Sequence, residues 1–580
     1  SQGMINSRDY VYYLLDNLQG EPIKRFMLPD TLGILYSSQV YEFIKEILAR
    51  YPNLHFDFHA HNDYGIATAN TLIAVEAGIK GIHCTVNGMG ERTGNAPLEE
   101  VVVGLHDFLK KHVGITEEDS LKDLSRNFTN TLISKNPEKK LADVIVDLVE
   151  NIAPHAVNVT SPYFVGHMTS AIPFFMVHLK TIVAALNQNV VKLETSKVVS
   201  VVEKQVVAKI HRMIYDKKES FYLENVQNTD TTLGVFVEGG TTANLTAMWA
   251  ARNAKFPPKD GFNGIESEGI VAAYQAYDVD RCVILVSRRG HYSLKKAGGI
   301  LGIGHQNIIA LDTDKKNRVD LSCLKQTIAR LKKESPKTCI LAIVGVAGST
   351  ETGSVDPLEK LAKIAKENDA HFHVDAAWGG PTLFSKKYKH LLKGIQLADS
   401  VTMDGHKQFY MPMSCGMLYL KEPHTLDVIA YYANYVNRKG SVDLGIKTLS
   451  GSREANSLIL DSALKIMGRK GYALLIDHGI ETAAAFAREI KKRPLFELWT
   501  APVLNILTYR VCPPAIRKKL ETAGESQRQA INEKLNTVNR RLQRIQREAG
   551  YSFVSRTTLL QDNNPNDAIV VLRSVIMNPM

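Results

Sequence analysis

The sequence is poor in cysteine and lacks long apolar runs. Six cysteines occur among 580 residues, no two of them form a Cys-x-x-Cys pair, and Cys282 and Cys339 lie in apolar, strand-like segments. These features argue against a disulfide framework and indicate buried, reduced thiols. No apolar run approaches the length of a membrane span, and no basic segment followed by a hydrophobic stretch occurs near the N-terminus. We therefore expect a cytoplasmic protein with no membrane partner.

The chain has no long segment of a single charge sign. Its net charge is +10 and its sequence pI is near 9.0, yet acidic residues are interspersed with the lysines and arginines. The most basic stretch, residues 539–547, carries four arginines at helical spacing, which is typical of the solvated face of a helix. We therefore expect no nucleic-acid partner.

Length and composition predict a globular protein of several structural units. A chain of 580 residues is too long for one core, and an apolar fraction of 44% with 22% charged residues is ordinary for a globular protein. We divide it into a barrel-like segment, a polar connector, a helical segment, a large α/β domain and a small C-terminal domain. Their predicted ranges are 1–115, 116–150, 151–230, 231–465 and 466–580.

The first hundred residues repeat a strand–turn–helix pattern three times. Strands are expected around residues 25–28, 55–58 and 81–86, and a helical pattern follows each one. This alternation predicts parallel strands joined by crossover helices. Three such units are too few to close an eight-stranded barrel, so the segment is predicted to be a partial barrel-like fragment.

Three motifs in this fragment resemble the last three βα units of the isopropylmalate and homocitrate synthase family, whose members are metal-dependent acyl-condensing barrels. They are Pro-Asp-Thr-Leu-Gly (29–33), His-Ala-His-Asn-Asp-Tyr-Gly (59–65) and Val-Asn-Gly-Met-Gly-Glu-Arg-Thr-Gly-Asn-Ala (86–96). The resemblance implies that His59 and His61 are candidate ligands of a divalent metal. The residues before Lys24 supply neither the further metal ligand nor the catalytic arginine of that family. A vestigial or scaffolding segment is therefore our first hypothesis, and metal-dependent condensation is the alternative.

Two motifs further along carry the strongest chemical signal: His-Val-Asp-Ala-Ala-Trp-Gly-Gly at residues 373–380 and Asp-Gly-His-Lys-Gln at residues 404–408. Pyridoxal 5'-phosphate (PLP) requires a lysine that holds its aldehyde as an imine and an acid that keeps its pyridine nitrogen protonated. Lys407 and Asp375 supply these groups, and the small residues after Asp375 leave room for a flat ligand. The pattern therefore predicts a PLP site.

Strand and helix patterns alternate around these two motifs. Strands are expected at residues 232–237, 282–287, 339–346, 371–374, 400–403 and 416–420. Their order predicts a largely parallel sheet with helices on both faces and a ligand site at the carboxyl ends of the strands. At those ends, Gly240 and Thr241 lie in the turn that leads into a helix, and the backbone amides at the start of that helix can bind the phosphate. His291 can stack on the pyridine ring, and Thr350 can hydrogen-bond a cofactor oxygen.

With these positions in place, residues 158–580 resemble the group II PLP-dependent amino-acid decarboxylases, which include glutamate, aromatic amino-acid and tyrosine decarboxylases. The resemblance implies the aspartate aminotransferase-like fold (fold type I), with a mostly parallel large domain, a small C-terminal α+β domain and a homodimeric assembly. It also implies that Lys407 forms the Schiff base, that His406 contacts the phosphate and that Ala377 lies against the ring. Tyr435 is the candidate proton donor that this resemblance supplies, and His291 is implied to stack on the cofactor during catalysis.

Shorter segments narrow the predicted substrate. Residues 161–170, 185–189 and 380–385 are similar to the aspartate 1-decarboxylase subgroup, and residues 572–579 are similar to a C-terminal segment of glutamate decarboxylases. The latter similarity implies that Arg573 binds a substrate carboxylate, which suits a planar guanidinium group. We expect α-decarboxylation of a small acidic amino acid, L-aspartate to β-alanine first and L-glutamate to γ-aminobutyrate second. A catalytically inactive interaction protein is the remaining alternative.

Overall fold

The computed structural model describes residues 2–85, 88–97, 121–433, 440–441, 443–564 and 566–579. The chain divides into two compact units, and each is described here by itself. Residues 1–161 with 548–551 form the first unit, and residues 162–547 with 552–580 form the second. Within the described ranges, no helix combines the length and the apolar character needed to cross a bilayer.

The first unit contains a three-stranded parallel sheet in the order β1-β2-β3, as the strand–helix alternation predicts. The strands are β1 (Phe26–Asp30), β2 (Phe56–Ala60) and β3 (Gly81–His83). The helices are α1 (Gln2–Asn6), α2 (Arg8–Leu18), α3 (Ser37–Arg50), α4 (Ala67–Glu76), α6 (Leu121–Ser125) and α7 (Leu141–Asp147). Helix α3 shows why this unit folds, because Val40, Phe43, Ile44 and Ile47 form one apolar stripe and are all buried in its core.

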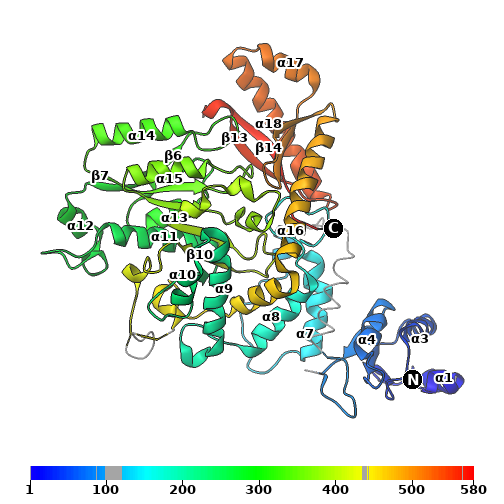
Figure 1. Ribbon diagram of the computed structural model, residues 1–580. Coiled ribbons are helices and arrows are strands. Elements are labelled where there is room, and N and C mark those ends of the chain that lie inside the picture. Colours follow the sequence, from blue (N-terminus) through cyan, green and yellow to red (C-terminus); the bar gives the residue numbers. More distant parts are fainter. Residues whose placement is uncertain are drawn as a thin grey trace. The chain divides into compact units, whose positions relative to one another are not determined.

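The second unit is built around a seven-stranded sheet in the order β4-β10-β9-β8-β7-β5-β6 (Figure 1). The strands are β4 (Gly234–Val237), β5 (Arg281–Ser287), β6 (Ile308–Leu311), β7 (Thr338–Val346), β8 (His371–Asp375), β9 (Ser400–Asp404) and β10 (Gly416–Leu420). Only β10 runs against its neighbours, so the sheet is mostly parallel. The sequence patterns predicted six of these strands and missed β6, a four-residue edge strand that pairs with β5 alone.

Helices cover both faces of this sheet, and Figure 1 shows α14 and α15 on one side and α11 and α13 on the other. They are α8 (Phe174–Leu186), α9 (Val198–Tyr215), α10 (Glu219–Asn225), α11 (Gly240–Lys255), α12 (Ile265–Tyr277), α13 (Ser293–Ile300), α14 (Leu321–Glu334) and α15 (Leu358–Glu367). Strand β5 explains this layering because its alternate side chains enter different cores. Ile284 and Val286 pack with α11, whereas Val283 and Leu285 pack in the cluster that contains α14 and α15.

The C-terminal part of this unit is a small α+β domain, drawn in orange and red in Figure 1. Its antiparallel sheet has the order β11-β12-β14-β13. The elements are α16 (Asn456–Lys491), β11 (Phe496–Thr500), β12 (Ile506–Val511), α17 (Pro514–Thr522), α18 (Glu525–Glu548), β13 (Ser555–Leu560) and β14 (Ala568–Val575). The fold class predicted from the sequence is therefore confirmed for the large and the small domain alike.

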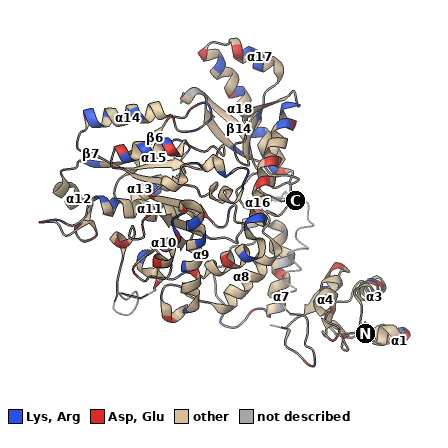
Figure 2. Ribbon diagram, viewed as in Figure 1, with Lys and Arg blue, Asp and Glu red and all other residues tan. Residues whose placement is uncertain are grey.

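Helix α18 contains the basic stretch of the sequence. Arg540, Arg541, Arg544 and Arg547 are exposed, while Asn536 and Asn539 on the opposite face are buried and bind the sheet backbone. Acidic and basic residues are mixed on other outer helices such as α9 and α15 (Figure 2). The arginines thus occupy the solvated face of a packed helix, as their spacing indicates.

Candidate active site

A cavity of about 580 Å³ lies at the carboxyl ends of the parallel strands. Most of the residues that line it end or follow β4, β5, β7, β8 and β9, where a sheet of this kind brings strand ends together, and His167, Met168 and Ser414 come from other segments. Eight candidates from the sequence line this one cavity: Gly240, Thr241, His291, Thr350, Asp375, Ala377, His406 and Lys407. The structure therefore gathers residues up to 167 positions apart in the sequence around one space, and their individual roles stay predictions.

Lys407 stands in the loop that follows β9 and forms an ion pair with Asp404, the last residue of that strand. Lys407 Nζ lies 2.9 Å from Asp404 Oδ2. Asp404 is buried, and its Oδ1 has no hydrogen-bond partner among the described residues. His406 is held by the 2.7 Å contact between its Nδ1 and the carbonyl oxygen of Cys415. The loop thus presents an amine to the cavity and holds it with a buried carboxylate.

Asp375 ends β8 and is also buried at the cavity. Its Oδ2 accepts a hydrogen bond from Asn244 Nδ2 at 2.9 Å, and its Oδ1 accepts one from the Ala377 amide at 3.2 Å. A carboxylate that is held on both oxygens keeps a fixed orientation. This arrangement is suited to pairing with a protonated heterocyclic nitrogen.

The start of α11 has the close packing that a phosphate cradle requires. A Cβ atom on Gly240 would lie 2.9 Å and 3.1 Å from the Asp404 carboxylate oxygens and 3.3 Å from Ala377 Cβ, so this position needs glycine. The first amides of a helix have no partner within the helix, and they favour an anion. Glu238 also lines the cavity as an exposed residue, which places one acid at the same end. Together with Lys407 and Asp375, this cradle fits the parts of PLP: aldehyde, ring nitrogen and phosphate.

His291 is oriented by the first residue of α13. The Ser293 amide donates to His291 Nδ1 at 3.3 Å, so the proton of the neutral ring is on Nε2. Burial lowers the pKa of His291, Asp375 and Asp404 oppose that effect, and Lys407 adds to it. A neutral imidazole with a fixed tautomer can stack on a pyridine ring and donate from Nε2.

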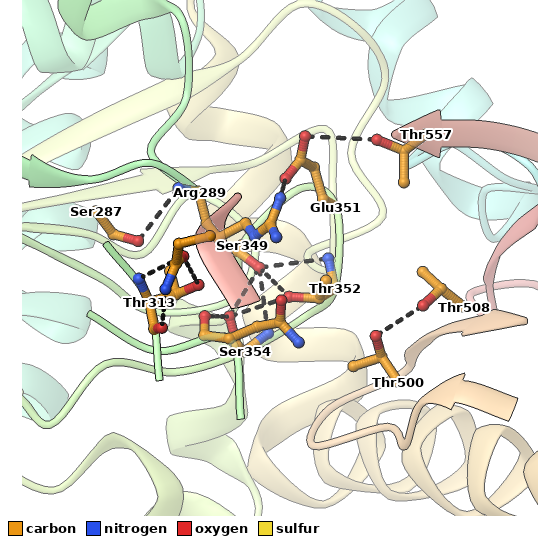
Figure 3. A network of polar contacts seen from close by, with 12 residues as sticks. Ser287, Arg289, Thr313, Ser349, Glu351, Thr352, Ser354, Thr500, Thr508 and Thr557 are labelled. Carbon is orange, nitrogen blue, oxygen red and sulfur yellow. Dashed lines mark hydrogen bonds and ion pairs between the residues drawn. The ribbon is translucent and has the colours of Figure 1, made fainter. Parts of the chain in front are cut away.

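An ion pair of the large domain lies beside the cavity, and a hydrogen bond joins it to the small domain (Figure 3). Arg289, which follows β5 and lines the cavity, places its Nη1 2.6 Å from Glu351 Oε2. Thr557 of β13 donates to Glu351 Oε1 at 3.4 Å. The nearby Ser349 hydroxyl contacts those of Thr352 and Ser354 at 2.8 Å and 2.9 Å, so it is engaged within its own turn. In this loop, Gly348 and Thr350 line the cavity.

Arg573 is not among the residues that line the cavity, but it is bonded to the segment that does. It lies on β14, is 8% exposed, and donates from Nη1 to Ser555 Oγ at 3.0 Å and to the Gly166 carbonyl at 3.4 Å. His167, the next residue, lines the cavity. Arg573 forms no ion pair in the described part of the chain, and its Nε has no hydrogen-bond partner there. Burial lowers its pKa to about 10, which leaves the guanidinium charged at neutral pH.

Two further predictions concern Tyr435 and the histidine pair of the first unit. Tyr435 lies outside the described residues, so its role as a proton donor stays a prediction. In the first unit, His59 and His61 bring their Nε2 atoms to 3.3 Å, and Asn95 Nδ2 lies 3.2 Å from His59 Nε2. No group of three or more His, Cys, Asp or Glu residues suited to a metal occurs among the described residues.

Four residues of this region received no role from the sequence: His167, Asn244, Arg289 and Asp404. His167 and Asp404 lie within the segments 161–170 and 404–408, whereas Asn244 and Arg289 lie close to Gly240 and His291 in the sequence. Arg289 and Asp404 occupy strand ends, which is the signal that could have identified them. Asn244 lies on the first turn of α11, and its contact with Asp375 depends on how that helix packs on β8.

This fold and this cavity define an α/β PLP enzyme of fold type I. Residues 124–512 match the family model described as the pyridoxal-dependent decarboxylase conserved domain, and residues 6–124 match the HMGL-like model. The chain belongs to the PLP-dependent decarboxylase family and is a carboxy-lyase with PLP as its cofactor. The resemblances drawn from the sequence for both parts of the chain are confirmed.

Similar proteins support this assignment. The chain is 45% identical to the aspartate 1-decarboxylase of Aliivibrio fischeri, with 83% of this chain and 87% of that protein covered. It is 28% identical to the acidic amino acid decarboxylase GADL1 of Xenopus tropicalis, with 72% and 77% covered. The crystal structure of mouse CSAD superposes with a TM-score of 0.68 at 24% identity, over 80% of this chain and 90% of that one, which supports the fold.

Proposed function

We propose that this enzyme removes the α-carboxylate of L-aspartate to form β-alanine, with L-glutamate as the alternative substrate. Arg573 is the observation that carries the choice of an acidic substrate. This guanidinium is buried and charged, it forms no ion pair among the described residues, and the attraction of the more distant Glu351 is smaller than the effect of burial on its pKa. A substrate carboxylate bound there would supply the missing ion pair. The bond of Arg573 to Gly166 places it next to cavity-lining His167. The 45% identity to an aspartate 1-decarboxylase supports aspartate over glutamate.

The chain's own groups divide the work of the reaction among them. PLP, when bound, supplies the electron sink that accepts the electrons released with carbon dioxide. Lys407 provides the amine that holds its aldehyde, and it is the one lysine among the described residues that line the cavity. Asp375 holds the proton at the ring nitrogen, and the amides at the start of α11 bind the phosphate.

The remaining groups orient the substrate and move a proton. Arg573 binds the side-chain carboxylate, which leaves the α-carboxylate to be lost. His291 stacks on the ring and holds its only proton on Nε2. His291 and Tyr435 are the candidates for delivering a proton to the α-carbon after carbon dioxide leaves.

We also infer that the enzyme is a homodimer located in the cytoplasm. Three large apolar side chains of α8 are exposed: Phe174 by 60%, Ile182 by 54% and Leu186 by 49%. An apolar helix face of this kind favours burial against a second copy. All six cysteines are free, which suits a reducing compartment. Analytical ultracentrifugation tests the dimer, and a monomer at micromolar concentration would contradict it.

The decisive assay uses the purified full chain, PLP and each amino acid separately. We expect β-alanine and carbon dioxide from L-aspartate at a higher kcat/KM than γ-aminobutyrate from L-glutamate. Lys407→Arg is the matched control because it keeps a cation beside Asp404 but cannot form the imine, and its activity should fall at least about a thousandfold. A protein that binds PLP and yet forms no amine from any amino acid would refute the proposal.

A further inference from the structure

A chain of hydrogen bonds runs behind Asp375, away from the cavity, through residues of β8, β9 and α11. Asn244 Nδ2 lies 2.9 Å from Asp375 Oδ2, and Asn244 Oδ1 lies 3.0 Å from His373 Nε2. His373 Nδ1 lies 2.8 Å from Ser400 Oγ, which in turn lies 2.7 Å from His371 Nε2. Asn244, His373 and Ser400 are each 1% exposed or less, and His371 is half-buried at the start of β8.

The direction of the first two bonds follows from the chemistry of Asp375. An ionised carboxylate only accepts hydrogen bonds, so the amide nitrogen of Asn244 must face Asp375. The second proton of the same nitrogen is donated to Ser293 Oγ at 3.0 Å, so both protons of the amide are used. Asn244 Oδ1 is therefore the acceptor for His373, and His373 Nε2 carries a proton.

The direction of the outer two bonds follows from the neutral state of His373. Burial lowers the pKa of His373 to about 3, so the ring carries a single proton at neutral pH. Because that proton is on Nε2, Nδ1 must accept a hydrogen bond from the Ser400 hydroxyl. The Ser400 oxygen then accepts from His371 Nε2, and burial also lowers the pKa of His371. All four bonds therefore donate in the same sense, toward Asp375.

We propose that His371, Ser400, His373 and Asn244 act as positioning residues whose aligned hydrogen bonds stabilise the negative charge of Asp375 and thereby hold the PLP ring nitrogen in its protonated form. Aligned donors polarise one another in a buried environment, so the last donor in the series is stronger than an isolated amide. A protonated ring nitrogen is what makes the cofactor an effective electron sink. The inference concerns the cofactor site and is independent of which amino acid is the substrate.

The other titratable groups around this cavity come from several different elements and are unchanged in the variants below. Those that line the cavity are His167, Glu238, Arg289, His291, Tyr292, Asp404, His406 and Lys407. Thr402 offers a matched control because it lies on β9, is fully buried, and places its Oγ1 3.4 Å from His373 Nε2 without being a link in the series. A variant at Thr402 therefore shows the effect of changing a buried polar side chain next to His373 while the four aligned hydrogen bonds stay intact.

The test follows the ring nitrogen of ¹⁵N-labelled PLP by NMR as a function of pH, together with PLP affinity by equilibrium dialysis. His373→Phe keeps a ring but removes both bonds, and we expect the bound nitrogen to lose its proton at a pH about one unit lower and the affinity to fall about tenfold. His373→Gln restores a donor to Asn244, so it should lie closer to wild type than His373→Phe. Thr402→Val should match wild type in both measurements.

Ser400→Ala removes the hydrogen bonds of Ser400 to His373 and His371 but keeps the two bonds nearest to Asp375, so its effect should be smaller. We expect a shift of the ring nitrogen in the same direction as in His373→Phe and of lesser size, and this variant decides the matter where His373→Phe fails to fold. A ring nitrogen with the wild-type response to pH in a folded His373→Phe or in Ser400→Ala would overturn the proposal. Equal losses in Thr402→Val would overturn it as well, because they would indicate a general packing effect.

Discussion

Lys407 Nζ lies 2.9 Å from Asp404 Oδ2, so the amine that is proposed to hold the cofactor is paired with a buried acid only three residues earlier in the chain. The other oxygen of Asp404 has no hydrogen-bond partner in the described structure. Lys407 is therefore the main neutralising contact of a carboxylate that is 2% exposed. The pair keeps the cavity polar and controls how easily the amine becomes free to react.

Replacing Asp404 with Asn should speed covalent incorporation of PLP into the cofactor-free protein by about tenfold. An amide does not hold an ammonium as a carboxylate does, and the amine must lose its proton before it attacks the aldehyde carbon. The growth of visible absorbance after mixing with PLP measures this rate. Asp404→Glu, which keeps the charge, is the control, and slower incorporation in Asp404→Asn would contradict the expectation.

Replacing Arg573 with Met should lower kcat/KM for L-aspartate by about ten- to a hundredfold, because a charged hydrogen-bond donor to the substrate carboxylate is lost. The melting temperature of the Arg573→Met variant should equal or exceed that of wild type, since the change removes a buried charge that has no ion-pair partner among the described residues. Steady-state kinetics and thermal denaturation separate the two effects. Arg573→Lys should recover part of the activity, and unchanged kinetics in Arg573→Met would argue against substrate binding by this residue.

Ligand sites in sheets of this kind lie at the carboxyl ends of the parallel strands, and this explains how much of the site could be predicted from the sequence. Gly240, His291, Asp375 and Lys407 each follow or end a parallel strand, and such strands finish at one edge, so their convergence follows from the topology alone. The same rule brings the loops of Arg289 and Glu351 to one edge, because they follow the neighbouring parallel strands β5 and β7. It does not predict that these two side chains form an ion pair or that Glu351 contacts Thr557 of β13, because both contacts depend on how the loops pack.

The contact between Asn244 and Asp375 also could not be predicted from the sequence, although the helix that contains Asn244 was. The sequence predicts a helix after the Gly-Gly turn, and the structure confirms it. Whether the fifth residue of that helix faces solvent or the sheet depends on its rotation, which a single sequence with closely spaced small residues does not define. The helical period alone therefore could not show the contact between Asn244 and Asp375.

Acid should destabilise the second unit through His211 of α9. His211 is fully buried, with Nε2 2.9 Å from the Leu420 carbonyl oxygen and Nδ1 3.0 Å from the Tyr222 hydroxyl. Burial lowers its pKa to about 4 in the folded protein, against 6.5 for an exposed histidine. The unfolded chain therefore binds more protons between these pH values, so the stabilisation is complete above about pH 6.5 and is lost as the pH falls toward 4.

The loss amounts to about 3 kcal/mol over that interval, from about 1.4 kcal/mol per pH unit. The midpoint of urea unfolding, followed by tryptophan fluorescence from pH 7 to pH 4, measures it. His211→Gln can still donate to the Leu420 carbonyl but does not titrate. Its midpoint should therefore start lower than that of wild type and fall less steeply with acid. Parallel curves for the two proteins would show that His211 does not contribute.

Decarboxylation should be independent of the histidine pair in the first unit. Every described residue that lines the proposed active site belongs to the second unit, whereas His59 and His61 belong to β2 and the turn after it in the first. We expect His59→Ala with His61→Ala, and chelation with EDTA, to leave the rate of β-alanine formation within about twofold, the range expected when no contact to the reacting groups is changed. The wild-type protein mixed with acetyl-coenzyme A and a 2-oxo acid should form no condensation product. A loss of decarboxylation above fivefold, or a condensation rate that these two substitutions abolish, would instead give the first unit a catalytic role.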